Sequence, residues 1–225
     1  MARVYGIEDY KSPVRLAEKV IWSTQVYFWT LCIIFVVQVW FLSGGSPSGN
    51  HPFFTPMVMT VGFVHLLASL VSGWFYLAWF RRGIINVRAL GVRGVRASAT
   101  GAWLWHFVPL ANLVMPFRVM KQIAIGSQPG VWEMDHVKKH PNPKGLGWWW
   151  GLLLLGSLGV EVDALNLSAQ TLDYLRWVWV FQMSLQGASS WICMSLIQSY
   201  SYLQDEKAEE ILDVMDEVGE EPSPG

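Results

Sequence analysis

Two prolines interrupt an apolar stretch and create the best candidate for a polar intramembrane site. The stretch WLWHFVPLANLVMPFR contains Pro109 and Pro116. A proline inside a helix removes a backbone hydrogen bond and clashes with the carbonyl four residues back, so both positions break the helix. The freed carbonyl and amide groups could hold an ion or a polar ligand together with Asn112, which lies between the prolines. The simpler alternative is that Asn112 only satisfies the freed backbone.

Four further polar side chains within apolar segments are candidates for the same site. His106 and His65 are ionisable and could belong to a proton or ligand path, although neutral hydrogen-bonded packing is the commoner state of a lone histidine. Gln182 and Gln186 share a helix face and could line a polar path or simply bond neighbouring helices. Since GxSxG, HExxH, P-loop and dinucleotide motifs are absent from the sequence, we expect no catalytic residue, metal or cofactor.

A basic stretch follows the second long apolar segment. Its arginines lie within sixteen residues, and such stretches are attracted to the anionic lipids of the cytoplasmic leaflet. We expect lipid-headgroup or structural roles for Arg81, Arg82, Asn86, Arg88, Arg93, Arg96 and Arg118.

Long uncharged segments must place these residues in a membrane. About 20 apolar residues cross a hydrocarbon core, and the predicted spans cover residues 20–42, 53–80, 146–162 and 177–203. Between the second and third spans lie the proline-broken segment, at residues 101–117, and an amphipathic interfacial helix at 116–125. The fold class is therefore an all-α membrane protein, with four spans if the broken segment re-enters and five if it crosses.

The distribution of positive residues favours four spans. If the broken segment returns to the side it entered from, every lysine and arginine except Arg176 lies on one side, which the positive-inside rule assigns to the cytoplasm. This arrangement predicts an integral membrane protein with a cytoplasmic N-terminal segment (1–19), a transmembrane domain (20–203) and a cytoplasmic tail (204–225). Irregular backbone at membrane depth must be covered, so the broken segment should pack inside the helix bundle.

Composition supports a membrane protein and identifies expected partners. Hydrophobic residues make up 52% of the chain and charged residues 15%, and there are 14 tryptophans. The tail at 204–225 is strongly acidic and could meet a basic protein partner or the chain's own basic loops. The remainder is basic beside the spans, which favours membrane lipids with anionic headgroups over nucleic acid. The sequence is compatible with a homo-oligomer.

The chain resembles a bacterial integral membrane family, domain of unknown function 4328. The resemblance covers roughly residues 65 to 200, includes the tryptophan cluster at 148–150, and implies a multi-span membrane protein without implying an activity. It rests on Arg82, Asn86, Trp105, Pro109, Asn112, Pro116 and Arg118.

Two functional hypotheses follow from these patterns. The first is a non-enzymatic structural or interaction protein that acts through protein or lipid contacts. The alternative is a small channel or transporter whose site lies at the broken helix near Asn112.

The re-entrant topology can be tested by cysteine accessibility. A Lys139→Cys variant should react with a membrane-impermeant thiol reagent from the cytoplasmic side of inverted vesicles and stay unlabelled in intact cells. The unsubstituted chain is the control, because Cys32 and Cys193 lie within apolar segments. Labelling from outside alone would refute the re-entrant topology.

Overall fold

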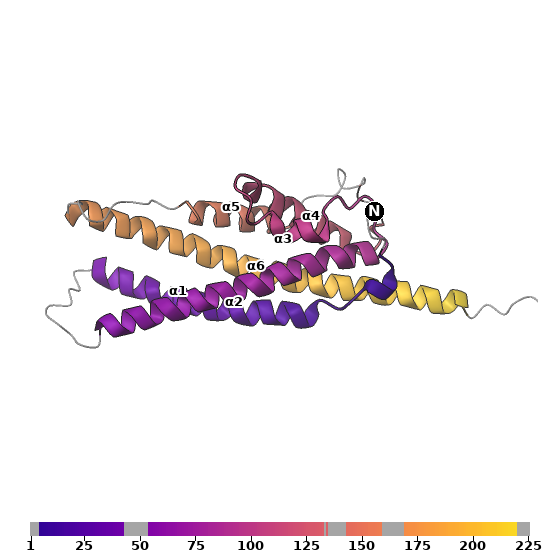
Figure 1. The fold of residues 1–225 in the computed structure, drawn as a ribbon, viewed down its shortest axis with the longest axis horizontal. Coiled ribbons are helices and arrows are strands. Elements are labelled where there is room, and N and C mark those ends of the chain that lie inside the picture. Colours follow the sequence, from indigo (N-terminus) through magenta and orange to yellow (C-terminus); the bar gives the residue numbers. More distant parts are fainter. Residues whose placement is uncertain (1–4, 43–53, 133, 135–142, 159–168, 220–225) are drawn as a thin grey trace, which may run out of the picture. The chain divides into compact units, whose positions relative to one another are not determined.

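Helices are the regular elements of the part of the chain that the structure describes. This computed structural model describes residues 5–42, 54–132, 134, 143–158 and 169–219 (Figure 1). Three long helices, α1 (Val14–Leu42), α2 (Phe54–Ala89) and α6 (Ala169–Gly219), form unbroken ribbons. The shorter elements are η1 (Ile7–Asp9), α3 (Ala99–Leu104), η2 (Ala111–Leu113), α4 (Met115–Gly126) and α5 (Leu146–Gly156).

The all-helical class is confirmed, and two of the helices are long and apolar enough to cross a membrane. These candidate spans are Ile7–Trp40 and Pro56–Ala89. Of the other two predicted spans, residues 177–203 lie within α6, whereas the span predicted at 146–162 is helical only over α5, at 146–156, and its residues 159–162 lie outside the described residues. The predicted interfacial helix corresponds to α4. Helix α6 continues past residue 203 to Gly219 without interruption, so the acidic residues begin within a helix that starts at Ala169.

Contacts divide the chain into two compact units. Unit 1 comprises Met1–Lys19, Phe75–Leu146 and Ser195–Gly225, and unit 2 comprises Val20–Trp74 and Gly147–Met194. Helices α1, α2 and α6 each contribute to both units.

Unit 2 joins its helices through a few polar pairs between otherwise apolar surfaces. Thr24 of α1 lies 2.7 Å from the Ser72 hydroxyl of α2. Ser189 of α6 donates to the Trp149 carbonyl of α5 at 3.0 Å. Gly156 of α5 lets α6 approach, since an added Cβ would lie 2.9 Å from the Gln186 side chain and 3.2 Å from its backbone nitrogen. Small residues and hydroxyl bonds of this kind are characteristic of helix packing within membranes.

Unit 1 is built around a buried chain of side-chain amides. Asn86 of α2 is fully buried, and its amide donates to the backbone carbonyl of Lys11 at 2.9 Å and to Gln204 Oε1 of α6 at 3.0 Å. Gln204 donates in turn to the Ser127 hydroxyl at 3.1 Å and to the Gly83 carbonyl at 3.3 Å. These bonds connect the N-terminal segment, α2, α6 and the end of α4.

A buried lysine extends this connection by one helical turn of α6. Lys207 has no exposed surface, donates to the carbonyls of Gly126 (3.0 Å) and Val131, and lies 4.6 Å from the centre of the Trp132 ring. Burial lowers the pKa of this amine from its ordinary value to about 8, while the nearby Glu210 carboxylate opposes the shift. Its cation is therefore held by backbone oxygens and an aromatic face.

The N-terminal segment is fixed to the same part of α6. The hydroxyls of Tyr10 and Ser12 both donate to the carboxylate of Asp205, the latter at 2.7 Å. Lys11 lies between them and pairs its backbone with the Asn86 side chain. The first acid of the tail is thus engaged within unit 1.

Replacing Gln204 should destabilise the protein. Gln204→Leu keeps the volume but leaves the Asn86 amide, the Ser127 hydroxyl and the Gly83 carbonyl without this partner. We expect a loss of about 2 kcal/mol, or a decrease in Tm of roughly 4–8 °C, measured by tryptophan fluorescence in detergent. Gln198→Leu, on the same helix but exposed, is the control. Equal Tm values for the two variants would contradict a structural role for Gln204.

Candidate functional site

The proline-broken segment consists of short turns between two helices. Helix α3 is capped by Ser98, whose hydroxyl accepts from the Gly101 amide at 2.8 Å, and it ends at Leu104, before either proline. Leu110 has a φ of 63°, which places it in the left-handed region directly after Pro109. Pro116 lies in the first turn of α4, where a proline is tolerated. The second proline therefore starts a helix.

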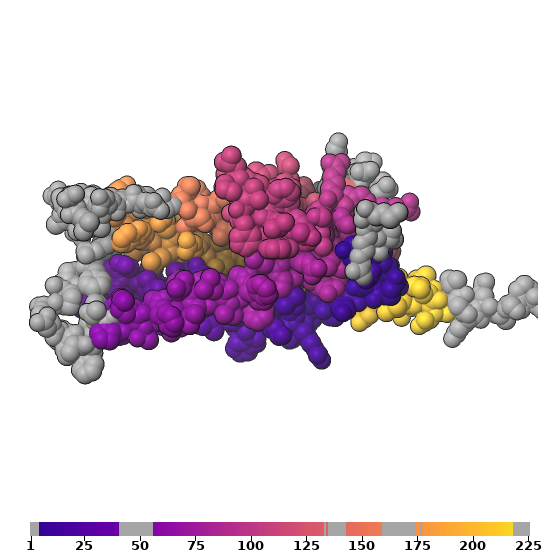
Figure 2. All heavy atoms as spheres, viewed as in Figure 1, coloured from indigo at the N-terminus to yellow at the C-terminus, as the bar shows by residue number. Residues whose placement is uncertain are grey.

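The prediction that this segment packs inside the bundle is wrong. Asn112 is exposed, as are Phe107 (64%) and Leu110 (79%), and Figure 2 shows the pink atoms of this part of the chain at the surface. The physical reason is local. Asn112 donates its backbone N–H to the Val108 carbonyl at 2.9 Å, and Leu113 donates to Leu110 at 3.1 Å. Successive turns pair much of the backbone, so the break depends less on cover from other helices.

One of the predicted polar residues, His106, packs against helix α2. Its ring packs edge-on against Phe80 and Tyr76 of α2, with centroids 5.1 and 5.5 Å apart. Nδ1 lies 3.3 Å from the Trp103 carbonyl, and Nε2 is buried without a hydrogen-bond partner among the described residues. The geometry corresponds to aromatic packing.

The remaining predicted polar residues belong to unit 2, whereas His106 and Asn112 belong to unit 1. His65 lies 2.9 Å from the Thr30 hydroxyl and stacks on Tyr27. Gln182 donates to the Leu158 carbonyl, and Gln186 donates to that of Gly156 at 2.8 Å. Each of these side chains thus bonds within its own unit.

The basic stretch divides into structural and exposed members. Arg88 donates to the carbonyls of Val95 (3.3 Å) and Ala97 (2.8 Å), and Arg82 donates to that of Asp9 at 3.5 Å. Asn86 was predicted to contact lipid headgroups or to have a structural role. The headgroup role is wrong, because the Asn86 side chain is buried and cannot reach a lipid. The exposed members are Arg81, Arg93 and Arg96, and Arg118 of α4 is exposed as well.

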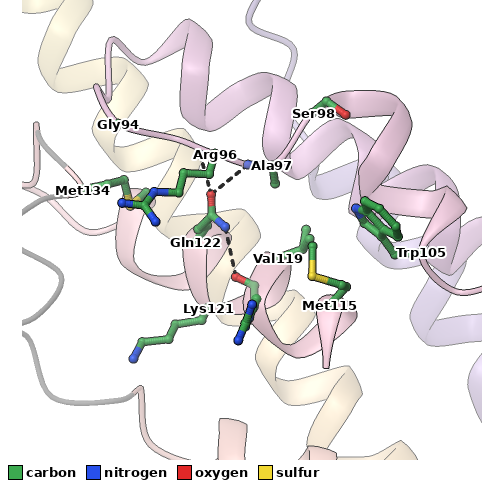
Figure 3. A pocket seen from close by; sticks show the side chains of 11 residues that line it. Gly94, Arg96, Ala97, Ser98, Trp105, Met115, Val119, Lys121, Gln122 and Met134 are labelled. Carbon is green, nitrogen blue, oxygen red and sulfur yellow. Dashed lines mark hydrogen bonds between the residues drawn. The ribbon is translucent and has the colours of Figure 1, made fainter. Parts of the chain in front are cut away.

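Two of these exposed arginines line a pocket of about 600 Å³ (Figure 3). It lies within unit 1 between the loop that precedes α3 and helix α4, with Arg96 from the loop and Arg118 and Lys121 from the helix. Its lining residues are Gly94, Arg96, Ala97, Ser98, Trp105, Met115, Arg118, Val119, Lys121, Gln122 and Met134. The described lining contains three cations and no carboxylate.

Gln122 holds the loop against α4. Its Oε1 accepts from the backbone amides of Arg96 (2.9 Å) and Ala97 (3.1 Å), as the dashed lines in Figure 3 show. A second attachment joins Arg93 to the backbone of Trp132 at 2.9 Å and of Met134 at 2.8 Å. The sequence marks Arg96 and Arg118 as basic residues but gives no signal that pairs them, because Gln122 and Met134 act through tertiary contacts.

Metal ligands do not gather in the described ranges, where no three His, Cys, Asp or Glu side chains form a group that could hold an ion. Cys32 and Cys193 are free thiols.

Comparison with known proteins gives one match. The family model described as "Domain of unknown function (DUF4328)" matches residues 53–218. No curated protein and no solved structure gave a match. The matched range includes α2, α4, α5 and most of α6.

The role of Gln122 can be measured by limited proteolysis. Gln122→Leu removes the acceptor that fixes the Arg96 and Ala97 amides, so trypsin should cleave after Arg93 and Arg96 several-fold faster in detergent solution. Mass spectrometry identifies the cleavage sites. The control is again Gln198→Leu, and identical cleavage rates in both variants would show that the loop is held without Gln122.

Proposed function

The chain belongs to the DUF4328 family, a domain of unknown function, and from this premise we propose a non-enzymatic integral membrane protein that acts through contacts with lipids and proteins. The proposal rests on one observation: two long helices expose many of their apolar side chains. In α1, Trp22 is 71% exposed and Trp29 is 65% exposed. In α2, Met59 and Leu70 are 70% and 62% exposed.

This exposure distinguishes the two helices from the core helices of a water-soluble protein. A core helix buries its apolar residues, but only 6% of the most apolar window of Pro56–Ala89 and 22% of that of Ile7–Trp40 are buried. Contiguous apolar surface on this scale requires a lipid or protein cover. Lipid contact fits both the length and the all-round apolar character of these segments.

The proposed topology has four spans with both termini in the cytoplasm of a bacterial inner membrane. Two observations support it. The short apolar helix α5 and the uncharged 177–203 part of α6 lie where the third and fourth spans are predicted, and the positive-inside count assigns nearly all cations to one side. The exposed broken segment would then enter one leaflet with its apolar side chains toward lipid, as its self-paired turns allow. The acidic end of α6 is exposed at every position from Leu212 to Glu217 and remains available to a basic partner.

Membrane integration can be tested with two matched leucine variants. Leu70→Lys places a cation near the middle of α2 and should lower the fraction resistant to alkaline carbonate extraction, because insertion of lysine there costs roughly 2.5–3.5 kcal/mol. Leu212→Lys, at a similarly exposed leucine in the acidic end of α6, should leave that fraction unchanged. Equal extraction of both variants, or release of the wild-type chain by carbonate, would exclude α2 as a span.

Reconstitution of the chain in liposomes tests the alternative function, a channel or transporter. Asn112 is exposed and is not among the residues that line the described pockets. Liposomes containing the wild-type chain should therefore show the ion permeability of empty liposomes. An ion flux that Asn112→Ala abolishes would replace the proposed function with transport.

A further inference from the structure

We propose that the pocket between the 94–98 loop and α4 binds the phosphate group of an anionic phospholipid. The inference rests on the proposed membrane function and names the lipid chemistry that this surface selects. The phosphate would lie among Arg96, Arg118 and Lys121, and the glycerol and first acyl carbons would lie against the apolar lining.

The charges of the lining select an anion. Arg96 and Arg118 carry guanidinium groups, which match phosphate oxygens in a two-point geometry, and Lys121 adds a third cation. Within the described residues, no hydrogen bond or ion pair engages these three side-chain heads. In Figure 3, Arg96 and Lys121 extend on the same side of Gln122. A phosphate group in the pocket would be balanced by positive charge contributed by two separate elements.

The backbone that carries Arg96 is fixed before any ligand binds. Gln122 accepts from the amides of Arg96 and Ala97, and Arg88 donates to the carbonyl of Ala97 at 2.8 Å. Val95 of the loop packs against a buried cluster formed by Val87, Val92, Ile125, Val131 and Met134. A fixed loop loses little conformational entropy on binding, which favours a specific site over a mobile basic patch.

The surroundings favour a lipid phosphate over a free phosphate ion. Trp105, Met115 and Val119 provide apolar walls, and a volume of about 600 Å³ is in the range of pockets for larger organic ligands. The neighbouring broken segment exposes Leu110, at 79%, and other apolar side chains. Cations beside exposed apolar residues form the pattern of a surface that lies at the level of lipid headgroups.

Binding can be measured with a soluble short-chain lipid. The purified full chain in a non-ionic detergent is titrated with dioctanoyl phosphatidylglycerol, and tryptophan fluorescence is followed because Trp105 lines the pocket. Dioctanoyl phosphatidylcholine, glycerol phosphate and inorganic phosphate are titrated in parallel. We expect saturable binding of the anionic lipid, and binding at least about tenfold weaker for the other three ligands.

A charge-matched pair of triple variants tests the site. Arg96→Gln, Arg118→Gln and Lys121→Gln together should weaken binding of the anionic lipid at least about tenfold. The control combines Arg15→Gln, Arg81→Gln and Arg93→Gln, which removes the same charge from exposed positions outside the pocket and should change the affinity less than about twofold. Unchanged Tm values for both triples show that the effects concern binding.

Other results would overturn the proposal in distinguishable ways. Equal losses in the two triple variants would mean diffuse charge attraction in place of a site. Inorganic phosphate or glycerol phosphate binding as tightly as the lipid would identify a soluble anion as the ligand. Absence of saturable binding to the wild-type chain would refute the pocket's role, whereas carbonate extraction independently reports whether the proposed membrane function fails.

Discussion

Unit 1 depends on the requirement that buried polar groups be paired. Asn86 and Gln204 are both buried, and each would cost stability if it lost its hydrogen bonds. Their amides bond each other and also reach the backbone of Lys11 and Gly83, so a single connected set of bonds fixes the N-terminal segment to two helices. Movement of either helix would leave several partners unsatisfied at once.

The geometry of the basic pocket depends on the same set of buried bonds. Gln204 and Lys207 bond to Ser127 and Gly126, which fixes the end of α4. Gly126 also lets the end of α4 lie close to α2, because an added side chain would overlap Val87. With α4 held in this way, Gln122 can hold the loop that carries Arg96. The buried bonds at the end of α4 and the exposed cations of Arg118 and Lys121 are thus connected through the same helix.

Sequence reasoning succeeded where the relevant physics is local. Uncharged segments of sufficient length predicted the long helices, and a proline in the first turn predicted the start of α4. It failed at the broken segment because it assumed that backbone freed by Pro109 must be covered by other helices, whereas the turns around Asn112 pair much of that backbone locally. Asn86 was found by its place in the family pattern, but its burial was not foreseen.

The sequence by itself determined the helical class, the apolar segments and the basic and acidic regions, because each follows from composition or from spacing along one helix. It also determined the family, through the match of residues 53–218 to the family model. Only the tertiary structure decided which polar residues meet. Asn86 and Gln204 are 118 positions apart, and Gln122 reaches the Arg96 amide across 26 positions. Such pairs depend on how distant helices pack, and a periodicity within one segment carries no information about its partner.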